Sequence, residues 1–267
     1  MLFIDLKNLK EEEVFLFKQL KEVSSRMGKN RDLIQVSGGN TSIKFNTSML
    51  IKASGQKLSN ALKKNIFVEV DISNNSSFKK QHNNFKNTFS FSNLRPSIET
   101  CMHSIMPHKV VLHSHPIEVI ANTLIPNKLN LQKKILKDIN WEFIDYYKPG
   151  NELANAIKIA LSKRHVDVLI LSNHGLVVGA ETPLEAELIQ TKVVKTLECT
   201  VRKKQAINLD KLKYLQESIP EIHLPSDDIV HTLAADLWSN KLVKMSPYSP
   251  DHAVFCGVNP LCFDNIE

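Results

Sequence analysis

Cysteine is scarce in this sequence, and no two cysteines are placed to act together. The four cysteines are widely spaced and form no Cys-x-x-Cys pair (Cys101, Cys199, Cys256 and Cys262). This spacing argues against a disulfide framework, which needs paired cysteines in an oxidising compartment. We therefore expect reduced, buried thiols and a cytoplasmic location.

Long apolar runs are absent as well. No stretch approaches the roughly 18 consecutive apolar residues that a membrane-spanning helix needs. Residues 1–13 contain only a short apolar run before charged residues begin, so we do not expect a signal peptide. The sequence predicts no membrane partner.

Concentrated positive charge is the third absence. The formal net charge is +6, but the lysine pairs that produce it are dispersed, and few aromatic residues accompany them. Nucleic-acid partners are therefore not expected, since they are usually bound by a basic block or stripe. A mild positive field can still attract a small anionic substrate. The chain also contains no Gly-x-Gly-x-x-Gly sequence of a dinucleotide-binding turn.

Alternating helical and extended patterns fill most of the chain. Its 267 residues, of which 42% are hydrophobic, suffice for one sizeable domain with an extension. Apolar residues at helical spacing predict a helix over 9–28, and alternation predicts a strand over 66–72. Further helices are expected at 98–106, 116–124, 130–139, 151–163, 182–204 and 227–238; strands or turns at 36–43, 49–55, 109–115, 141–147, 166–172, 176–179 and just before Gly257; and an exposed polar loop at 73–93.

Two of these helices have recognisable start signals. Thr182 is a plausible N-cap, followed by proline at the first helical position and Glu185 at the third. Ser97 is a plausible N-cap for the helix expected from Ile98, which places Glu99 in its first turn.

The most informative feature is a pair of histidines, His113 and His115, at the end of an apolar, β-branched run. Such a run predicts a buried strand, and side chains two residues apart on a strand point to the same face. The two imidazoles can therefore chelate one metal ion. Taken alone, the pair can equally consist of two structural histidines. Glu99 and His103, one helical turn apart, are an alternative pair of metal ligands.

A third histidine supports the metal interpretation. His174 lies between a buried strand and Gly175, at a strand end where side chains reach a cleft. A lone histidine in such a place is more often a hydrogen-bonded core residue. Its meaning depends on the other motifs.

Four short segments, read in order, resemble the class II aldolase/adducin family. They are Ser37-Gly-Gly-Asn-Thr-Ser42, Ala53-Ser-Gly55, Pro96-Ser-Ile-Glu99, and the His113-x-His115 strand followed by Asn173-His-Gly175. The family includes fuculose- and rhamnulose-phosphate aldolases, a ribulose-phosphate epimerase, a methylthioribulose-phosphate dehydratase and the non-catalytic adducin head. The resemblance covers roughly residues 10–205. Its style is closest to the aldolase part of bacterial proteins that fuse such a domain to a short-chain dehydrogenase.

The resemblance implies a fold and a domain organisation. The fold is an α/β three-layer α/β/α sandwich around a largely antiparallel central sheet. Residues 1–205 form the catalytic domain, and 206–267 are a C-terminal extension of unknown role. Family members are commonly homo-oligomers, and a homotetramer is expected here.

The resemblance also implies site residues. His113, His115 and His174 bind a divalent cation, usually Zn²⁺, although Mn²⁺, Fe²⁺ or Co²⁺ can use the same ligands. Glu99 is the acid/base carboxylate, and an apolar surrounding would raise its pKa towards neutrality. Phosphate-binding residues are expected in the two glycine-containing turns and the Pro-Ser segment (Gly39, Asn40, Ser54, Gly55 and Ser97).

The chain departs from the simple aldolases at one position. Fuculose-phosphate aldolase has Ser-Ser-Glu where this chain has Ser97-Ile98-Glu99, so one hydroxyl contact to phosphate is missing; Arg95 can offset it. Family aldolases also use a tyrosine, often from a neighbouring subunit, as proton donor on the aldehyde side. No motif selects it among the four tyrosines of this chain (Tyr146, Tyr147, Tyr214 and Tyr248).

The resulting expectation is a metal-dependent aldolase that cleaves a ketose 1-phosphate into dihydroxyacetone phosphate and an aldehyde. A sugar-phosphate dehydratase or epimerase using the same ligands is the alternative within enzymes. An adducin-like assembly module is the alternative outside enzymes, and the intact histidines and Glu99 argue against it.

Overall fold

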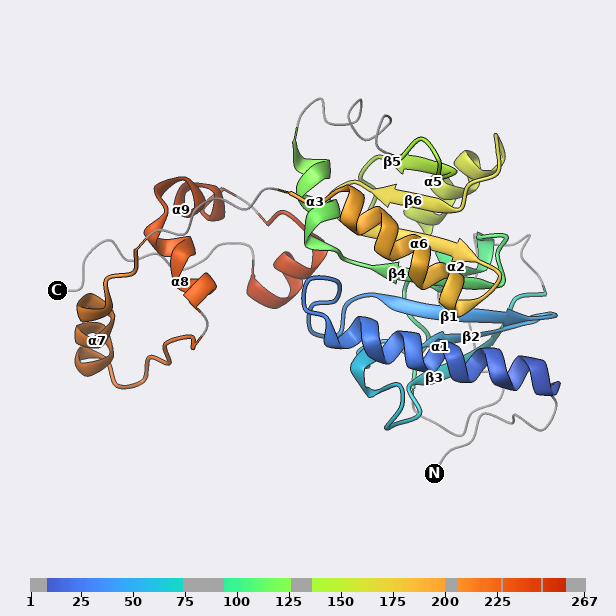
Figure 1. Cartoon of the computed structure of the whole chain (residues 1–267), viewed down its shortest axis with the longest axis horizontal. Helices are drawn as coiled ribbons and strands as arrows, with labels where there is room; N and C mark the ends of the chain where they lie inside the picture. The colour runs from blue at the N-terminus through green and yellow to red at the C-terminus, as the bar shows by residue number, and fades with distance from the viewer. Residues whose placement is uncertain are drawn as a thin grey trace. The chain divides into compact units, whose positions relative to one another are not determined.

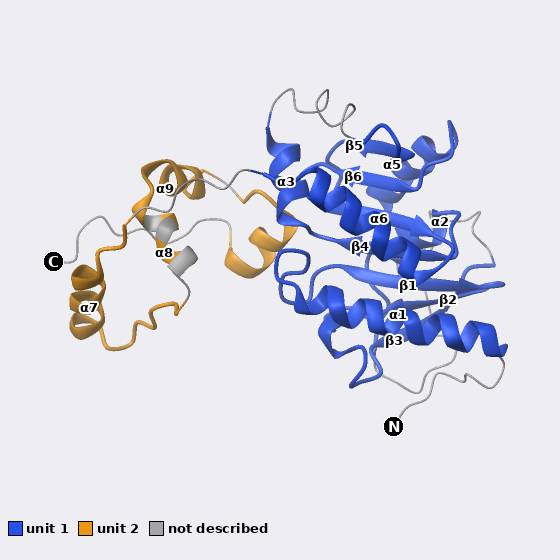
Figure 2. Ribbon diagram, viewed as in Figure 1, with its two compact units in different colours: residues 1–199 blue, residues 200–267 orange. Residues whose placement is uncertain are grey.

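The computed structural model describes residues 9–73, 94–125, 136–199, 206–226, 228–245 and 247–257. The chain divides into two compact units, residues 1–199 and 200–267 (Figure 2). The predicted site residues all lie in the first unit. Among the described helices, none combines the length and apolar character needed to cross a membrane.

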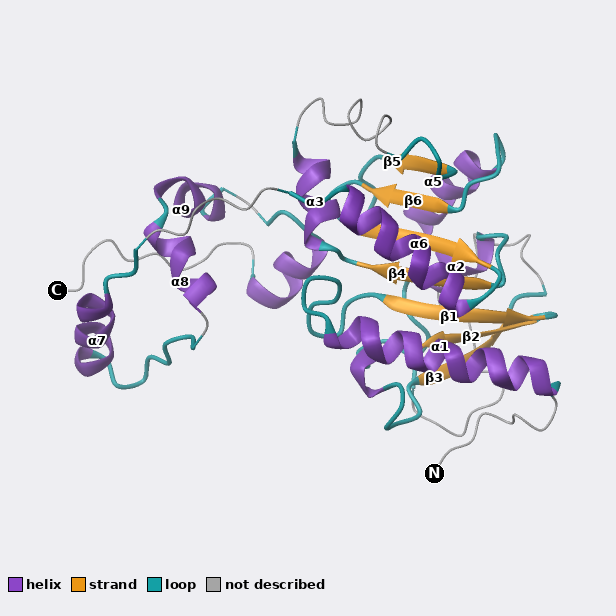
Figure 3. Cartoon of the chain, viewed as in Figure 1, coloured by secondary structure: helices purple, strands orange, loops and turns teal. Residues whose placement is uncertain are grey.

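The first unit alternates helices and strands, as the sequence patterns predict (Figure 3). Its strands are β1 (Asn40–Phe45), β2 (Ser48–Lys52), β3 (Phe67–Asp71), β4 (Val110–Ser114), β5 (Trp141–Ile144), β6 (Val168–Leu171) and β7 (Gly175–Ala180). Its helices are α1 (Glu11–Lys29), η2 (Leu58–Asn60), α2 (Thr100–Ile105), α3 (Ile117–Leu124), α5 (Asn151–Leu161) and α6 (Pro183–Thr196).

The strands form one seven-stranded sheet in the order β3-β2-β1-β4-β7-β6-β5. Every neighbouring pair is antiparallel except β5 and β6, which run parallel. The expected largely antiparallel sheet is therefore confirmed. Strand β4, which carries the predicted histidine pair, lies in the middle of the sheet and is shielded on both sides by its neighbours.

Helices cover both faces of the sheet, which confirms the three-layer architecture (Figure 1). Helices α1 and α6 share one apolar cluster with alternate strand residues, including Val110 and Leu112 of β4. The intervening Val111 belongs to the cluster on the other face, together with residues of α2 and α5. Alternation along β4 thus buries both faces of the strand. By the same alternation, His113 points to the face covered by α2, and Ser114 points to α6.

Local signals fix the two helix starts differently from each other. Thr182 caps α6 through a 3.3 Å hydrogen bond from the Glu185 amide, with Pro183 at the first helical position, as predicted. Helix α2 begins at Thr100, two residues later than expected. The Ser97 hydroxyl accepts a 3.2 Å hydrogen bond from the Glu99 backbone amide, which holds residues 97–99 in a turn before the helix. The placement of Glu99 in the first helical turn was therefore wrong; it occupies the N-cap position.

Other expectations need correction or cannot be assessed. Helix α6 ends at Thr196 rather than 204. Residues 74–93, most of the expected polar loop, lie outside the described residues, and so do 130–135 of the helix expected at 130–139. The described remainder of that helix, 136–139, forms a turn. Cys101 is buried, but Cys199 is half-buried and Cys256 is exposed, so the expectation of buried thiols holds only in part.

The described part of the second unit is helical, with α7 (Leu209–Ser218), α8 (Asp228–Ala235) and α9 (Leu237–Val243). One helix was expected over 227–238, but Asp236 interrupts it and accepts the Ser239 amide at 2.8 Å as the N-cap of α9. A short π-helix (His252–Cys256) replaces the strand expected before Gly257.

Two glycines allow the neighbouring segments to pack closely against the end of β4. Gly39 has φ +60°, and a Cβ there would lie 2.7 Å from the His113 carbonyl oxygen. A Cβ on Gly175 would lie 2.3 Å from the Ser114 carbonyl oxygen. Both contacts are with backbone, which cannot easily move aside. Glycine at these positions therefore lets the start of β1 and the start of β7 approach the end of β4.

A Gly39→Ala substitution should destabilise the fold more than Gly55→Ala. Both glycines have positive φ, and this backbone conformation costs an alanine about 1–2 kcal/mol. Only the alanine at 39 would also collide with β4, since nothing lies within 4 Å of a Cβ on Gly55. Overpacking adds roughly 1–3 kcal/mol.

The measurement is the free energy of unfolding from urea titrations of the wild type and both variants. An equal loss in the two variants would show that the collision with β4 is relieved at no cost and that backbone conformation alone matters at position 39.

Candidate functional site

Strand pairing places the predicted site residues at one end of the sheet. Asn40, the first residue of β1, lies directly opposite His113 in the register of β1 and β4. His115 follows one residue after the end of β4, and His174 lies in the tight turn between β6 and β7. Asn173 in that turn has φ +56°, a left-handed conformation that asparagine tolerates better than most residues.

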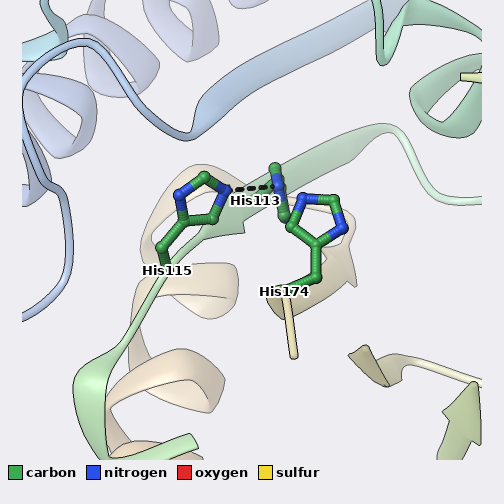
Figure 4. Close-up of side chains that lie close together, drawn as sticks. All are labelled: His113, His115 and His174. Carbon is green, nitrogen blue, oxygen red and sulfur yellow. Dashed lines mark hydrogen bonds between the residues drawn. The ribbon is translucent and has the colours of Figure 1, made fainter. Parts of the chain in front are cut away.

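The three predicted histidines converge there (Figure 4). We refer to His113, His115 and His174 as the histidine trio. The Nε2 atoms of His113 and His115 are 3.0 Å apart, and the ligand nitrogens of all three lie within 4.8 Å of one another. All three side chains are buried. The sequence prediction that these residues come together is thus matched by the geometry.

A backbone contact orients the central histidine. His113 Nδ1 lies 3.0 Å from the Leu176 carbonyl oxygen, which can only accept a hydrogen bond. Nδ1 therefore carries the proton, and in the neutral imidazole Nε2 presents a lone pair to the trio. A metal-binding histidine is commonly fixed in this way through its other ring nitrogen.

Glu99 completes the cluster from the start of α2. Its Oε1 lies 3.2 Å from His113 Nε2 and 3.1 Å from His174 Nε2. Burial by itself raises the pKa of this carboxyl, but the neighbouring His113 and His174 imidazoles outweigh burial and hold its pKa well below the usual range. The expected rise towards neutrality was therefore wrong, because the expectation assumed an apolar wall where the structure has imidazoles.

The donor set fits a divalent transition metal. His113 Nε2 faces both His115 Nε2 at 3.0 Å and the Glu99 carboxylate at 3.2 Å. One proton on this nitrogen cannot bridge both neighbours, whereas a cation among the three nitrogens is attracted by all of these groups. Three imidazoles with a further open position are typical of catalytic zinc sites, and the same set can hold other divalent metals.

Asn40 and Ser97, expected to contact phosphate, instead lie against Glu99. The Asn40 side-chain amide donates to Glu99 Oε2 at 2.7 Å and to the Ser97 hydroxyl at 3.3 Å. The first bond is buried and involves a charged acceptor, which makes it one of the stronger contacts of the site. Asn40 therefore fixes how the Glu99 carboxylate is turned. A phosphate contact by either residue stays a prediction.

The Ala53-Ser-Gly55 turn lies beside the Pro96-Ser97 segment, joined to it by a β-bridge between Ala53 and Pro96. Ser54 and Gly55 are exposed, and the space around the Gly55 Cα is open. The Ser54 backbone amide already donates to the Arg95 carbonyl at 2.8 Å. This leaves the Ser54 hydroxyl, rather than its amide, to contact an anion. The absence of a side chain at Gly39 allows the start of β1 to pack against β4, as described above.

The sequence patterns did not single out Lys52, the last residue of β2. Its side chain is buried, and Nζ donates to the Ser37 carbonyl at 2.7 Å. A buried ammonium is costly unless it is paired. A lysine at an inward-facing strand position, next to the Ser54-Gly55 turn, was therefore the sequence signal that could have identified Lys52 as a candidate site residue. It brings positive charge close to the two turns expected to bind an anion.

His103, together with Glu99, was the alternative pair of metal ligands. It is fully buried, and its Nδ1 lies 2.7 Å from the Ser42 hydroxyl. Burial, assisted by His113, lowers the pKa of His103 to about 3, so it stays neutral. It lies beside the site without joining the trio.

The tyrosines remain unassigned. Tyr146 and Tyr147 are exposed after β5, and Tyr214 is exposed in the second unit. The Tyr248 hydroxyl donates to the Leu242 carbonyl at 2.6 Å within the second unit. None of these contacts links a tyrosine to Glu99 or the trio.

Comparison with known proteins supports the fold and the family. An "Uncharacterized oxidoreductase YuxG" from Bacillus subtilis is 31% identical over 118 residues, which cover 43% of this chain but only 16% of that protein. Two solved structures share the fold, each at low sequence identity. The N-terminal class II aldolase domain of a conserved Thermoplasma acidophilum protein has a TM-score of 0.58 and 22% identity, covering 73% of this chain and 95% of that one. A sugar-phosphate aldolase from Thermotoga maritima has a TM-score of 0.56 and 12% identity, covering 81% and 100%.

The family match covers most of the chain. Residues 18–201 match the family described as "Class II Aldolase and Adducin N-terminal domain". This range contains the histidine trio, Glu99 and both glycine-containing turns. The chain therefore belongs to the class II aldolase and adducin family.

Proposed function

We propose that this protein is a metal-dependent aldolase that cleaves a ketose 1-phosphate into dihydroxyacetone phosphate and an aldehyde. The observation that carries the proposal is a buried glutamate within 3.2 Å of two members of a buried histidine trio. A structural core has no need to bury four ionisable groups together, since each of them costs desolvation. A non-catalytic assembly module would not require this arrangement either.

The histidine trio would hold the metal, with Zn²⁺ favoured and Mn²⁺, Fe²⁺ or Co²⁺ as alternatives. When bound, such an ion supplies Lewis-acid polarisation of a ketose carbonyl and its neighbouring hydroxyl. The protein side chains would fix the ion, exclude water and handle the proton. His113 contributes a pre-oriented lone pair through its bond to Leu176.

Glu99 would move the proton at the carbon next to the carbonyl. In the condensation direction the carboxylate removes this proton, and in the cleavage direction it returns it to the carbon that keeps the bonding electron pair. The lowered pKa of Glu99 keeps the carboxylate ionised, so it is free of a proton and able to accept one in the condensation direction. Asn40 holds Oε2, which leaves Oε1 directed towards the trio.

The phosphate of the substrate would bind towards the exposed turns. We propose contacts from the Ser54 and Ser97 hydroxyls and from Gly55, with Gly39 and Asn40 shaping the neighbouring wall. Lys52 supports this location because its ammonium group lies on the adjacent turn. An exposed Ile98 takes the place of a second hydroxyl. We further propose a homotetramer, as the family resemblance implies, and a cytoplasmic location, as the scattered cysteines predict.

A dehydratase or epimerase acting on a similar sugar phosphate is the second candidate. It would use the same metal ligands, the histidine trio, with Glu99 as the acid/base group. An aldolase requires a proton donor for the aldehyde oxygen, and the family resemblance implies a tyrosine, often from a neighbouring subunit.

The decisive experiment is an assay of the purified chain on a panel of ketose 1-phosphates. Release of dihydroxyacetone phosphate is followed with a coupled dehydrogenase, and the remaining sugar is analysed for epimers and dehydrated products. We expect cleavage that is lost after treatment with a chelator and restored by Zn²⁺. Epimer or dehydrated product without cleavage would replace the aldolase by the second candidate. A chelator-insensitive protein with no bound transition metal would favour an assembly module.

Glu99→Gln should lower kcat by roughly 10²- to 10⁴-fold, the usual contribution of a positioned acid/base group. The amide keeps the shape of the side chain but cannot accept the proton. Glu152→Gln is the control, since Glu152 is an exposed carboxylate in the first turn of α5. The two variants are compared by steady-state kinetics and by metal content. Equal rates in both variants would remove Glu99 from the proposed mechanism.

Asn40→Ala should lower kcat by about 100-fold with little change in KM, because a misplaced catalytic group costs rate rather than binding. Ser54→Ala is the matched comparison and should raise KM with little change in kcat, as expected for a phosphate contact. Kinetics over a range of substrate concentrations separates the two effects. A rise in KM alone for Asn40→Ala would assign this residue to phosphate binding.

A further inference from the structure

A second group of metal-ligand side chains lies at the other end of the sheet. His108 precedes β4, whereas His165 and Asp167 precede β6. His108 and His113 are five residues apart, so about 16 Å of extended strand separates this group from the histidine trio. We refer to His108, His165 and Asp167 as the second cluster. Neither Glu99 nor the trio takes part in it.

The three side chains of the second cluster converge on one oxygen atom. Asp167 Oδ1 lies 2.8 Å from His108 Nε2 and 2.7 Å from His165 Nε2. The ligand atoms of all three residues lie within 4.8 Å of one another. His165 and Asp167 are two residues apart in the short segment that leads into β6.

The frame around the cluster holds two of its members in place. Asn140 donates its side-chain amide to Asp167 Oδ2 at 3.0 Å, which turns Oδ1 towards both imidazoles. The backbone of Asp167 is bonded on both sides, donating to the Asn140 carbonyl and accepting the Gly179 amide, each at 2.8 Å.

His108 is fixed by packing and by its backbone. Its ring fills the space beside Gly179, where a Cβ would come within 2.2 Å of Nδ1. Its carbonyl accepts a 3.0 Å hydrogen bond from the half-buried Lys44 ammonium. The ring cannot turn far from Asp167, so His108 and Asp167 form a nearly fixed pair of ligands.

One member of the second cluster faces solvent. The side chain of His165 is 63% exposed, compared with 25% for Asp167 and 7% for His108. A cation can therefore enter from the His165 side. That imidazole can adjust its position so that the three ligand atoms reach the separations of a metal site, with bonds of about 2.0–2.2 Å. Water can occupy the remaining coordination positions.

We propose that His108, His165 and Asp167 form a second binding site for a divalent transition metal of the zinc class, separate from the histidine trio. Two imidazoles and one carboxylate are ligands that Zn²⁺ and its neighbours prefer. The site has the orienting contact expected outside a metal's own ligands, namely Asn140 on the carboxylate. Its ligands come from segments next to β4 and β6, which the sheet order separates by β7. A bound ion would brace these strands against each other and would be structural rather than catalytic.

Calorimetric titration of the chelator-treated full chain with Zn²⁺ tests the proposal. We compare the wild type with His165→Ala and with the control His223→Ala, which removes an exposed histidine of the second unit. The His165→Ala variant should bind one equivalent fewer than the other two proteins. Asn140→Ala should keep that equivalent but bind it about 10- to 100-fold more weakly. The comparison holds whether or not the trio binds metal, because all of these proteins retain the trio.

Folding and identity of the ligands are checked independently. Circular dichroism confirms that the variants are folded, and imidazole NMR signals of His108 and His165 should shift with the additional equivalent. Zn²⁺ should also raise the Tm of the wild type more than that of His165→Ala. Equal stoichiometry in the wild type and His165→Ala, or unshifted His108 and His165 signals, would overturn the proposal and leave the cluster as a hydrogen-bonded group only.

Discussion

The buried Glu99 carboxylate against the histidine trio is the interaction on which the site depends. A carboxylate in the interior carries a large desolvation cost, which must be met by hydrogen bonds or opposite charge. Here Oε1 lies next to the imidazoles of His113 and His174, and Oε2 accepts a hydrogen bond from the Asn40 side chain. The helix start, the first residue of β1 and two strand ends must therefore all be in place before this carboxylate is stable.

Some of the residues with positive φ lie in segments that lead to this site. Asn173 has φ +56° beside His174, and Gly39 has φ +60° beside the His113 carbonyl. Val36, which leads into the first glycine turn, has φ +51°, an uncommon and costly conformation for a β-branched residue. Strain of this kind persists where the surrounding structure over-determines the backbone, and it is concentrated at functional sites. The regular sheet and its two helical layers provide that support.

Much of the fold and the core of the site could be predicted from the sequence. The apolar runs before His113 and His174 correctly predicted strands, because a short apolar, β-branched segment favours a buried strand whatever its distant neighbours are. The ordered motifs identified the trio and Glu99 as neighbours. Local pattern failed where a side chain competed with the helix: Ser97 binds the Glu99 amide and delays α2, and Asp236 splits a helix that periodicity joined.

Other features depend on contacts between distant segments and left no local signal. The pKa of Glu99 depends on imidazoles that arrive from β4 and from the β6–β7 turn, so it could not be inferred from its own helix. Likewise, His108 and Asp167 meet across 59 positions of sequence, and neither stands in a motif.

The serine between the two motif histidines has a consequence for how the molecule tolerates change. Ser114 points away from the trio and donates to Gln190 of α6 at 3.0 Å, inside the opposite helical layer. The peptide segment that carries His113 and His115 is thus anchored from behind the sheet. A substitution in α6 that disturbs this hydrogen bond would act on the segment carrying the two imidazoles without changing the trio or Glu99. The helices behind the sheet therefore contribute to the geometry of the site.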